Sequence, residues 1–325
     1  MTTPTTEHDT PDDRQATLGF LATALSFLIW GVLPPYWKAL ESLDAPFEVL
    51  AHRIVWTAVL ANIILAARRR HGALLAALRT RHVAACLLVS MPTLAANWYL
   101  FIYAVQHDRV VECSLGYFMA PLVSMLIGRV FLREYLRPLQ VIAIVLAAAG
   151  VIVLTVGIVL TVGYDRMPWF AIALAVTFGF YGLARKKQPL QSIPALTAET
   201  TVLGAAALLY LTHLGVGAGK VPWRYSPGVI ALLLGAGVVT AAPLLLFGYG
   251  VRRIRLTTVG FCQYLAPTGM LLIGVLLYGE DFTVYHAIAF LLIWVALGFY
   301  TAHTLRAARR RAAPAPPPDE GPPPC

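Results

Sequence analysis

The sequence predicts an all-α polytopic membrane protein with about ten transmembrane helices, arranged as two inverted five-helix repeats. Three observations predict this fold. Of the 325 residues, 58% are hydrophobic and 13% are charged, whereas soluble domains average about 45–50% apolar and about 25% charged residues. The apolar residues gather in blocks of about 20, the length that an α-helix needs to cross a bilayer. A segment of the first half also recurs in the second half.

The apolar blocks follow one another along the whole chain. None shows the alternation of apolar and polar residues that marks a membrane β-strand, so each block is expected to be a helix. The block at 168–184 is short and contains Gly179 and Gly182. The predicted spans are 18–37, 47–67, 83–105, 111–132, 139–162, 168–184, 194–215, 227–250, 256–278 and 283–303.

Both ends of the chain differ from its apolar body. Residues 1–17 are polar and acidic, without the basic n-region, apolar h-region and cleavage site of a signal peptide. Residues 304–325 are basic and then rich in proline, a composition that does not form a packed core. We therefore expect two disordered cytoplasmic tails, which flank a first repeat at 18–162 and a second repeat at 163–303.

The net charge of +9 is distributed unevenly over the predicted loops. With ten spans and an interior N-terminus, the interior segments hold 18 Lys and Arg residues, and the exterior loops hold only Lys38, Arg109, Arg166, Lys220 and Arg224. This is the positive-inside bias of a plasma-membrane protein. The charge therefore predicts that both termini are cytoplasmic, and we expect no nucleic acid as a partner.

The duplicated segment recurs 146 residues later without a gap. Its register gives 13 identities over residues 101–154 and pairs span 4 with span 9 and span 5 with span 10. Each half therefore holds five spans, and because five is odd, the second half enters the membrane from the opposite side. Inverted repeats are typical of secondary transporters, whose substrate sites lie between the halves. The aligned motifs are Ala120-Pro121 with Ala266-Pro267, Leu126-Ile127-Gly128 with Leu272-Ile273-Gly274, and Glu134 with Glu280.

Two prolines of the repeat lie near the middle of their spans. Pro121 and Pro267 have no backbone N–H, which frees the carbonyl groups of Tyr117 and Gln263. Inside a bilayer, a freed carbonyl must find a partner or line a cavity. We expect helix kinks at both prolines, either beside a substrate cavity or satisfied by a neighbouring helix. At the helix ends, Glu134 is expected to tie a helix terminus to a loop.

Few ionisable side chains lie within the predicted spans. Arg53 and Glu199 hold matching repeat positions, each about 9 Å from the end of its span at about 1.5 Å per residue. They enter from opposite faces of a core about 30 Å thick, so Glu112 is a better-placed partner of Arg53 than Glu199. Intramembrane charges mark transport pathways by default; the alternatives are snorkelling and the locking of helices. His52 is a candidate for proton binding or for helix packing.

Polar and aromatic residues add candidates for a substrate cavity. Asn97 is unusual inside a span and needs a partner, which favours a cavity position for it and for the adjacent Trp98. Tyr36 and Trp37 are more typical of an aromatic belt at the membrane interface. The predicted cavity residues are Arg53, Asn97, Trp98, Tyr117, Gln263 and Tyr264, and the predicted coupling groups or charge partners are His52, Glu112 and Glu199.

The sequence carries no motif of a membrane enzyme. It lacks HExxH, a P-loop, a GxSxG nucleophile elbow and a carboxylate pair at metal-binding spacing. We expect no catalytic residue, no metal and no cofactor. The expected partners are a small-molecule substrate and the lipid bilayer, and a homodimer is left open. The alternative to a transporter is a membrane-embedded sensor or assembly subunit without transport.

Six segments carry a family resemblance: FLIWGVLPPYWK, EVLAHRIVW, NWYLFIYAV, SLGYFMAPL, FYGLARKK and GFCQYLAPT. Together they resemble the RarD-like permeases of the EamA family, in the drug/metabolite transporter superfamily. The resemblance runs from about residue 18 to about residue 303. It implies a bacterial inner-membrane transporter of small organic metabolites or drugs that works by alternating access. It also implies a cavity lined by spans 1–4 and 6–9, a scaffold of spans 5 and 10, and a link to chloramphenicol sensitivity.

Overall fold

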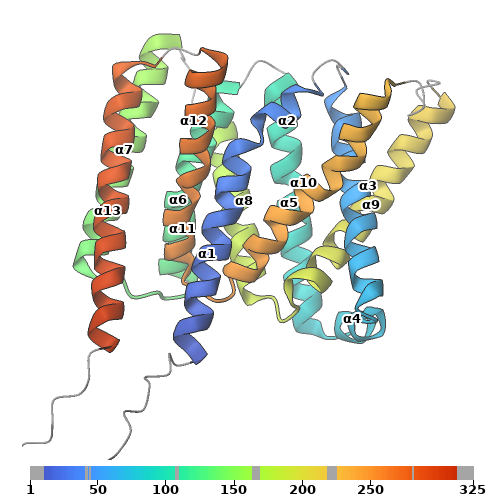
Figure 1. The fold of residues 1–325 in the computed structure, drawn as a ribbon, viewed down its shortest axis with the longest axis horizontal. Coiled ribbons are helices and arrows are strands. Elements are labelled where there is room, and N and C mark those ends of the chain that lie inside the picture. The colour runs from blue at the N-terminus through green and yellow to red at the C-terminus, as the bar shows by residue number, and fades with distance from the viewer. Residues whose placement is uncertain are drawn as a thin grey trace, which may run out of the picture.

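The protein is a bundle of helices that run roughly parallel to one another (Figure 1). The computed structural model describes residues 11–40, 43, 45–106, 110–162, 169–217, 225–279 and 282–312. The first half comprises α1 (Pro11–Val32), α2 (Pro34–Lys38), α3 (Pro46–Ala67), α4 (His71–Leu78), α5 (Arg81–Gln106), α6 (Val110–Phe131) and α7 (Pro138–Val162). The second half comprises α8 (Trp169–Lys187), α9 (Ser192–Gly217), α10 (Pro227–Gly250), α11 (Leu256–Gln263), α12 (Leu265–Tyr278) and α13 (Val284–Ala312).

Each predicted span coincides with one helix or with two consecutive helices. Within the described residues, seven helices are long and apolar enough to cross a membrane, and two shorter apolar stretches cover Leu115–Phe131 and Val284–Tyr300. The remaining span is α8, which has 19 residues and therefore extends about 28 Å at 1.5 Å per residue. The predicted all-helical membrane fold is confirmed.

Prolines interrupt the helix in two of the spans. α1 ends at Val32 and α2 begins at Pro34, so the first span is broken where the sequence reads Leu-Pro-Pro. In the second half, α11 ends at Gln263 and α12 begins at Leu265, because Pro267 cannot donate to the Gln263 carbonyl. In contrast, α6 runs through Pro121 as one helix.

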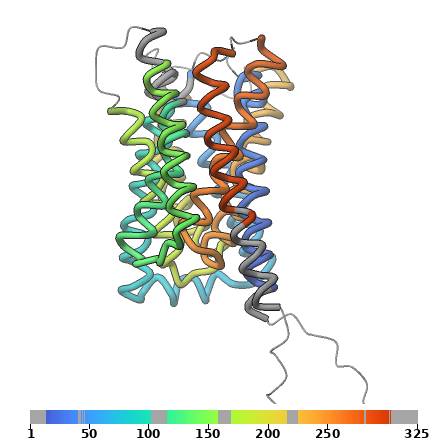
Figure 2. The backbone as a smooth tube through the Cα atoms, turned by 90° about the vertical axis from the view of Figure 1, so that its left-hand side faces the viewer, coloured from blue at the N-terminus to red at the C-terminus, as the bar shows by residue number. Residues whose placement is uncertain are grey.

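Three features at the ends of the bundle differ from the hydropathy pattern. The eight-residue helix α4, which was not predicted, is too short to cross a bilayer and lies across the foot of the bundle (Figure 2). α1 begins at Pro11 and α13 ends at Ala312, so both terminal helices extend beyond the predicted spans. Hydropathy detects the part of a helix inside the bilayer, whereas backbone hydrogen bonds continue beyond it. The rest of the predicted tails, 1–10 and 313–325, lies outside the described residues.

The helix contacts follow the pseudo-symmetry of the repeat. Three contacts of a helix in one half each have a counterpart made by the corresponding helix of the other half. α6 packs on α8, and correspondingly α12 packs on α1. In the same way, the contact of α5 with α8 corresponds to that of α10 with α1, and the contact of α3 with α10 corresponds to that of α9 with α5. Three further packings, α3 on α9, α6 on α11 and α7 on α13, each join one span to its own repeat partner. This pattern is the one expected of two halves related by a pseudo-two-fold axis.

The two scaffold candidates lie together at one edge of the bundle. α7 and α13 pack against each other, far from α3 and α9 (Figure 1). The first turn of α1 and the last turn of α13 lie at the same end of the bundle as α4 (Figure 1). An even number of spans requires both ends of the chain to lie on the same side of the membrane. The positive-inside bias predicts that the end of the bundle that carries α4 is the cytoplasmic one.

The contact between α3 and α10 offers a direct test of the packing between the halves. A Cβ atom built on Gly237 would lie 2.6 Å from the backbone carbonyl of Trp56, which cannot move aside as the end of a side chain can. We expect Gly237→Ala to lower the free energy of unfolding by roughly 1–3 kcal/mol, measured by denaturant titration in detergent micelles. Gly298→Ala is the matched control, because a Cβ there meets no atom within 4 Å. Equal losses in the two variants would contradict this packing.

Candidate functional site

Arg53 lies in the first half of α3 and is half-buried, with its guanidinium between two tryptophan rings. The guanidinium carbon is 5.0 Å from the ring centroid of Trp37 and 4.7 Å from that of Trp98. Aromatic faces stabilise a cation without using its hydrogen-bond donors. Its buried Nε atom has no hydrogen-bond partner among the described residues, and Tyr117 is close enough to interact electrostatically with the guanidinium.

Other buried polar atoms on α3 also lack hydrogen-bond partners within the described part of the chain. They are Oε2 of Glu48, both ring nitrogens of His52 and Nε1 of Trp56. An unpaired buried polar group costs about 1–3 kcal/mol, so such groups in a native protein call for water, an ion or a ligand. The N-terminal half of α3 therefore holds a cationic group and, beside it, buried polar groups without a partner among the described residues.

Glu48 is anchored on one side only. Its Oε1 atom accepts a hydrogen bond of 2.6 Å from the hydroxyl group of Tyr225, which lies just before α10. Burial and the neighbouring Glu48 carboxylate raise the pKa of Tyr225 to about 12. The phenol therefore stays protonated at neutral pH and donates to Glu48, and this contact joins the N-terminal ends of α3 and α10.

Asn97, a predicted cavity residue, joins two helices of opposite halves. Its amide nitrogen donates to the Leu174 carbonyl and to the Thr177 hydroxyl of α8, each at 3.1 Å. Both amide protons of Asn97 are thus used between α5 and α8. The adjacent Trp98 faces Arg53 instead. Asn97 thus has the partner that a polar residue inside a span needs, and this partner is the neighbouring helix α8.

The candidates beside the prolines lie in different surroundings. Tyr117 is half-buried and packs edge-on against Phe101. Gln263 is buried, and its Oε1 atom lacks a partner among the described residues. Tyr264 belongs to the apolar cluster around α7 and α13, together with Phe118 and Phe290. Tyr264 therefore packs with residues of α7 and α13, whereas the rings around the Arg53 guanidinium are Trp37 and Trp98.

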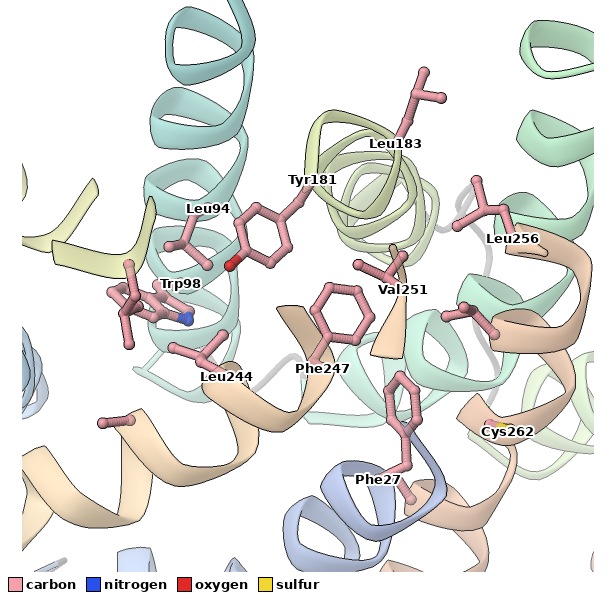
Figure 3. Close-up of a cluster of buried hydrophobic side chains, with 14 of the residues drawn as sticks. Phe27, Leu94, Trp98, Tyr181, Leu183, Leu244, Phe247, Val251, Leu256 and Cys262 are labelled. Carbon is pink, nitrogen blue, oxygen red and sulfur yellow. The ribbon is translucent and has the colours of Figure 1, made fainter. Parts of the chain in front are cut away.

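Five buried or partly buried aromatic rings form a cluster between the halves, which the sequence pattern did not reveal. Its members are Phe27 and Trp30 of α1, Phe178 and Tyr181 of α8, and Phe247 of α10, hereafter the aromatic cluster. Phe247 lies at its centre, 5.9 Å from Phe27 and stacked at 5.8 Å on Tyr181 (Figure 3). Phe178 and Trp30 complete the cluster at 5.5 and 6.0 Å from Phe247.

A buried ion pair lies beside the aromatic cluster. Oε1 of Glu199 lies 3.5 Å from Nη1 of Arg185, and the two side chains are 0% and 1% exposed. The Tyr181 hydroxyl donates to Oε2 of Glu199 at 3.5 Å. Gly248 of α10 leaves the space that the Arg185 guanidinium fills, because a Cβ there would overlap it. The charge partner of Glu199 is therefore Arg185, which directly follows the predicted span 168–184.

Of the remaining acidic residues, only Glu134 has a side chain within the described part of the structure. Glu134 accepts hydrogen bonds from the backbone N–H groups of Leu256 and Thr257 at 2.6 and 2.9 Å and from the Thr257 hydroxyl at 2.6 Å. It caps the start of α11, which confirms its predicted structural role. The side chain of Glu112 and the whole of Glu280 lie outside the described residues.

Comparisons with known proteins agree with this duplicated architecture. The sequence pattern of the EamA-like transporter family matches residues 17–156 and, a second time, residues 166–302. The chain is 42% identical over 286 residues to the uncharacterized transporter YojE of Bacillus subtilis, which covers 87% of this chain and 93% of that protein. It is 35% identical over 299 residues to the protein RarD of Escherichia coli, which covers 92% of this chain and 99% of that protein.

A solved crystal structure has the same fold. It superposes with a TM-score of 0.68 over 90% of this chain and 98% of its own chain. The sequence identity is 18%, so this similarity concerns the fold alone.

Proposed function

This chain belongs to the EamA-like transporter family, and on that premise we propose that it is a secondary active transporter of small organic metabolites or drugs. The relatives are named as transporters or as RarD, which supports transport rather than a sensor or assembly role. We place the protein in the bacterial inner membrane with both termini in the cytoplasm, on the basis of its 18-to-5 distribution of basic residues.

The observation that carries the proposal is the group of buried polar atoms around Arg53 that are unpaired within the described part of the chain. A half-buried guanidinium held between Trp37 and Trp98 offers a fixed positive charge and planar donors. Such a group binds carboxylate or phosphate oxygens in two-point fashion. The substrate that fits is a small organic anion or zwitterion, with its apolar part against the tryptophan and tyrosine rings.

Besides the substrate site, alternating access requires a barrier between that site and the cytoplasm. Between the Arg53 region and the end that carries α4 lie the aromatic cluster and the Arg185–Glu199 pair, which are buried or partly buried. We propose that this arrangement corresponds to a state closed to the cytoplasm. Exchange of conformations between the inverted halves would then open the inner side and close the outer side.

We propose that proton binding drives the cycle, with His52 as its first candidate. The two ring nitrogens of His52 lack partners among the described residues, and Glu48 lies one helical turn away on α3. An imidazole near neutral pH can accept a proton from one side of the membrane and release it when its surroundings change. Glu112, near the start of α6, is the second candidate.

A flux assay in proteoliposomes tests the function. Purified protein would be reconstituted and screened against radiolabelled organic acids, amino acids and cationic drugs, with and without an imposed proton gradient. The proposal predicts saturable counterflow of an anionic or zwitterionic solute that exceeds the rate in protein-free liposomes. Flux of cations alone would overturn the assigned substrate class, and the absence of any flux across the panel would count against transport.

A further inference from the structure

A cavity lies at the foot of the bundle, away from Arg53 and the aromatic cluster. It has a volume of about 450 Å³ and is bounded by α3, α4, α5 and α9. Its lining is almost entirely apolar, with Leu75 of α4, Leu88 of α5 and Val202 of α9 among its walls. These three side chains are largely exposed, so the cavity opens sideways onto the surface that faces the lipid.

The helix that forms one wall of this cavity is flanked by arginines. Arg68, Arg69 and Arg70 precede α4, and Arg79 and Arg81 follow it; all five are exposed. Residues 68–82 contain no acidic side chain. Figure 2 shows α4 and the start of α5 at the foot of the bundle, where the membrane surface would lie. The five arginines thus flank the helix that forms one wall of the apolar cavity, and they are hereafter its basic rim.

The turn between α3 and α4 contains a residue with a left-handed backbone. Arg69 has a φ of 51°, in the left-handed region, where it ends α3 with backbone bonds from Arg69 to Ala66 and from Arg70 to Leu65. Glycine or asparagine normally occupies such a helix end, because a Cβ atom is strained there.

We propose that the α4 cavity is a binding site for one anionic phospholipid, with an acyl chain in the cavity and the phosphate among the arginines. Basic pockets between transmembrane helices on the cytoplasmic side bind anionic headgroups. A free phosphate fits less well, because it would leave the apolar walls of the cavity in contact with water. A zwitterionic lipid also fits less well, because its headgroup would bring a positive charge to a basic rim that contains no acidic residue. The bound lipid joins α4 to α3, α5 and α9, whichever solute the protein transports.

The test compares two arginines that share one backbone conformation. Arg69 and Arg133 are both exposed and both have a left-handed backbone, with φ of 51° and 52°. Glycine suits that conformation, so Arg69→Gly and Arg133→Gly should both fold and each removes one positive charge. Arg69 lies two residues before α4, which lines the cavity, whereas Arg133 lies between α6 and α7. The affinity of each detergent-purified full-length variant would be measured by titration with phosphatidylglycerol and with phosphatidylcholine of the same acyl chains.

We expect the wild-type protein to prefer phosphatidylglycerol, and Arg69→Gly to weaken that binding about fivefold, the usual effect of one basic residue near an anionic surface. Arg133→Gly should bind as the wild type does. Ala84→Trp, which fills the cavity from α5, should weaken binding of both lipids, and glycerol phosphate alone should not compete. Equal affinity for the two lipids, equal losses in the two glycine variants, or full competition by glycerol phosphate would each overturn the proposal.

Discussion

Glu199→Gln is expected to lower the free energy of unfolding by about 3–5 kcal/mol, because it leaves the Arg185 guanidinium buried without a counter-charge. The pair is almost completely excluded from solvent, and α5, α8, α9 and α10 meet around it. The same substitution should keep the hydrogen bond from Tyr181, since the glutamine carbonyl still accepts. The loss is therefore attributable to the charge. Denaturant titration in detergent micelles, followed by tryptophan fluorescence, provides the measurement.

The double variant Arg185→Gln/Glu199→Gln is the control for this prediction. Replacing both members of a buried pair by neutral groups is commonly far less costly than removing one. A double-mutant cycle should therefore show a strong favourable coupling between the two positions. If the double variant lost as much stability as the sum of the single variants, the pair would not be an ionic contact.

Arg53→Ala is expected to lower the apparent affinity for an anionic solute about ten- to a hundredfold while the protein remains folded. A hydrogen bond to a charged group contributes about 1.5–3 kcal/mol, and Arg53 is the cation held between Trp37 and Trp98. The apparent affinity would be measured as the half-saturating concentration for counterflow in proteoliposomes. Thermal unfolding of the same preparation separates a loss of binding from a loss of fold.

Arg53→Lys separates the charge of this residue from its geometry. Lysine keeps the positive charge but loses the planar donors that stack and bind in two-point fashion. We expect an intermediate affinity for the lysine variant. Unchanged counterflow in the alanine variant would show that Arg53 only joins helices, and equal loss in both variants would assign the effect to geometry alone.

The sequence was sufficient for the architecture because spans and orientation depend on local composition. The block at 168–184 is short, but it is apolar enough to predict a transmembrane span, and α8 lies there. Helix α4, which was not predicted, has only eight residues. A hydropathy pattern identifies helices of about 20 residues and therefore does not detect it. The register of the repeat aligns spans that also contact each other in the structure, such as α3 and α9.

The side-chain partners could not be predicted in the same way, because they depend on which helix faces meet. Arg185 opens an Arg-Lys-Lys run after an apolar block, a pattern typical of the interface. Its burial requires the absence of a side chain at Gly248, on another helix. Trp37 likewise resembled an interface residue, and only the position of α2 brings it over Arg53. A single sequence gives the types of residue in a site but not their contacts.

Alternating access is the central claim, and the accessibility of one position from both faces tests it most directly. A Tyr117→Cys variant would be made in a protein whose native cysteines, Cys86, Cys113, Cys262 and Cys325, are replaced by serine or alanine. A membrane-impermeant maleimide would then be added to right-side-out and to inside-out vesicles. We predict labelling from both faces, in proportions that shift when a transported solute or a proton gradient is supplied. Labelling from a single face under every condition would contradict alternating access.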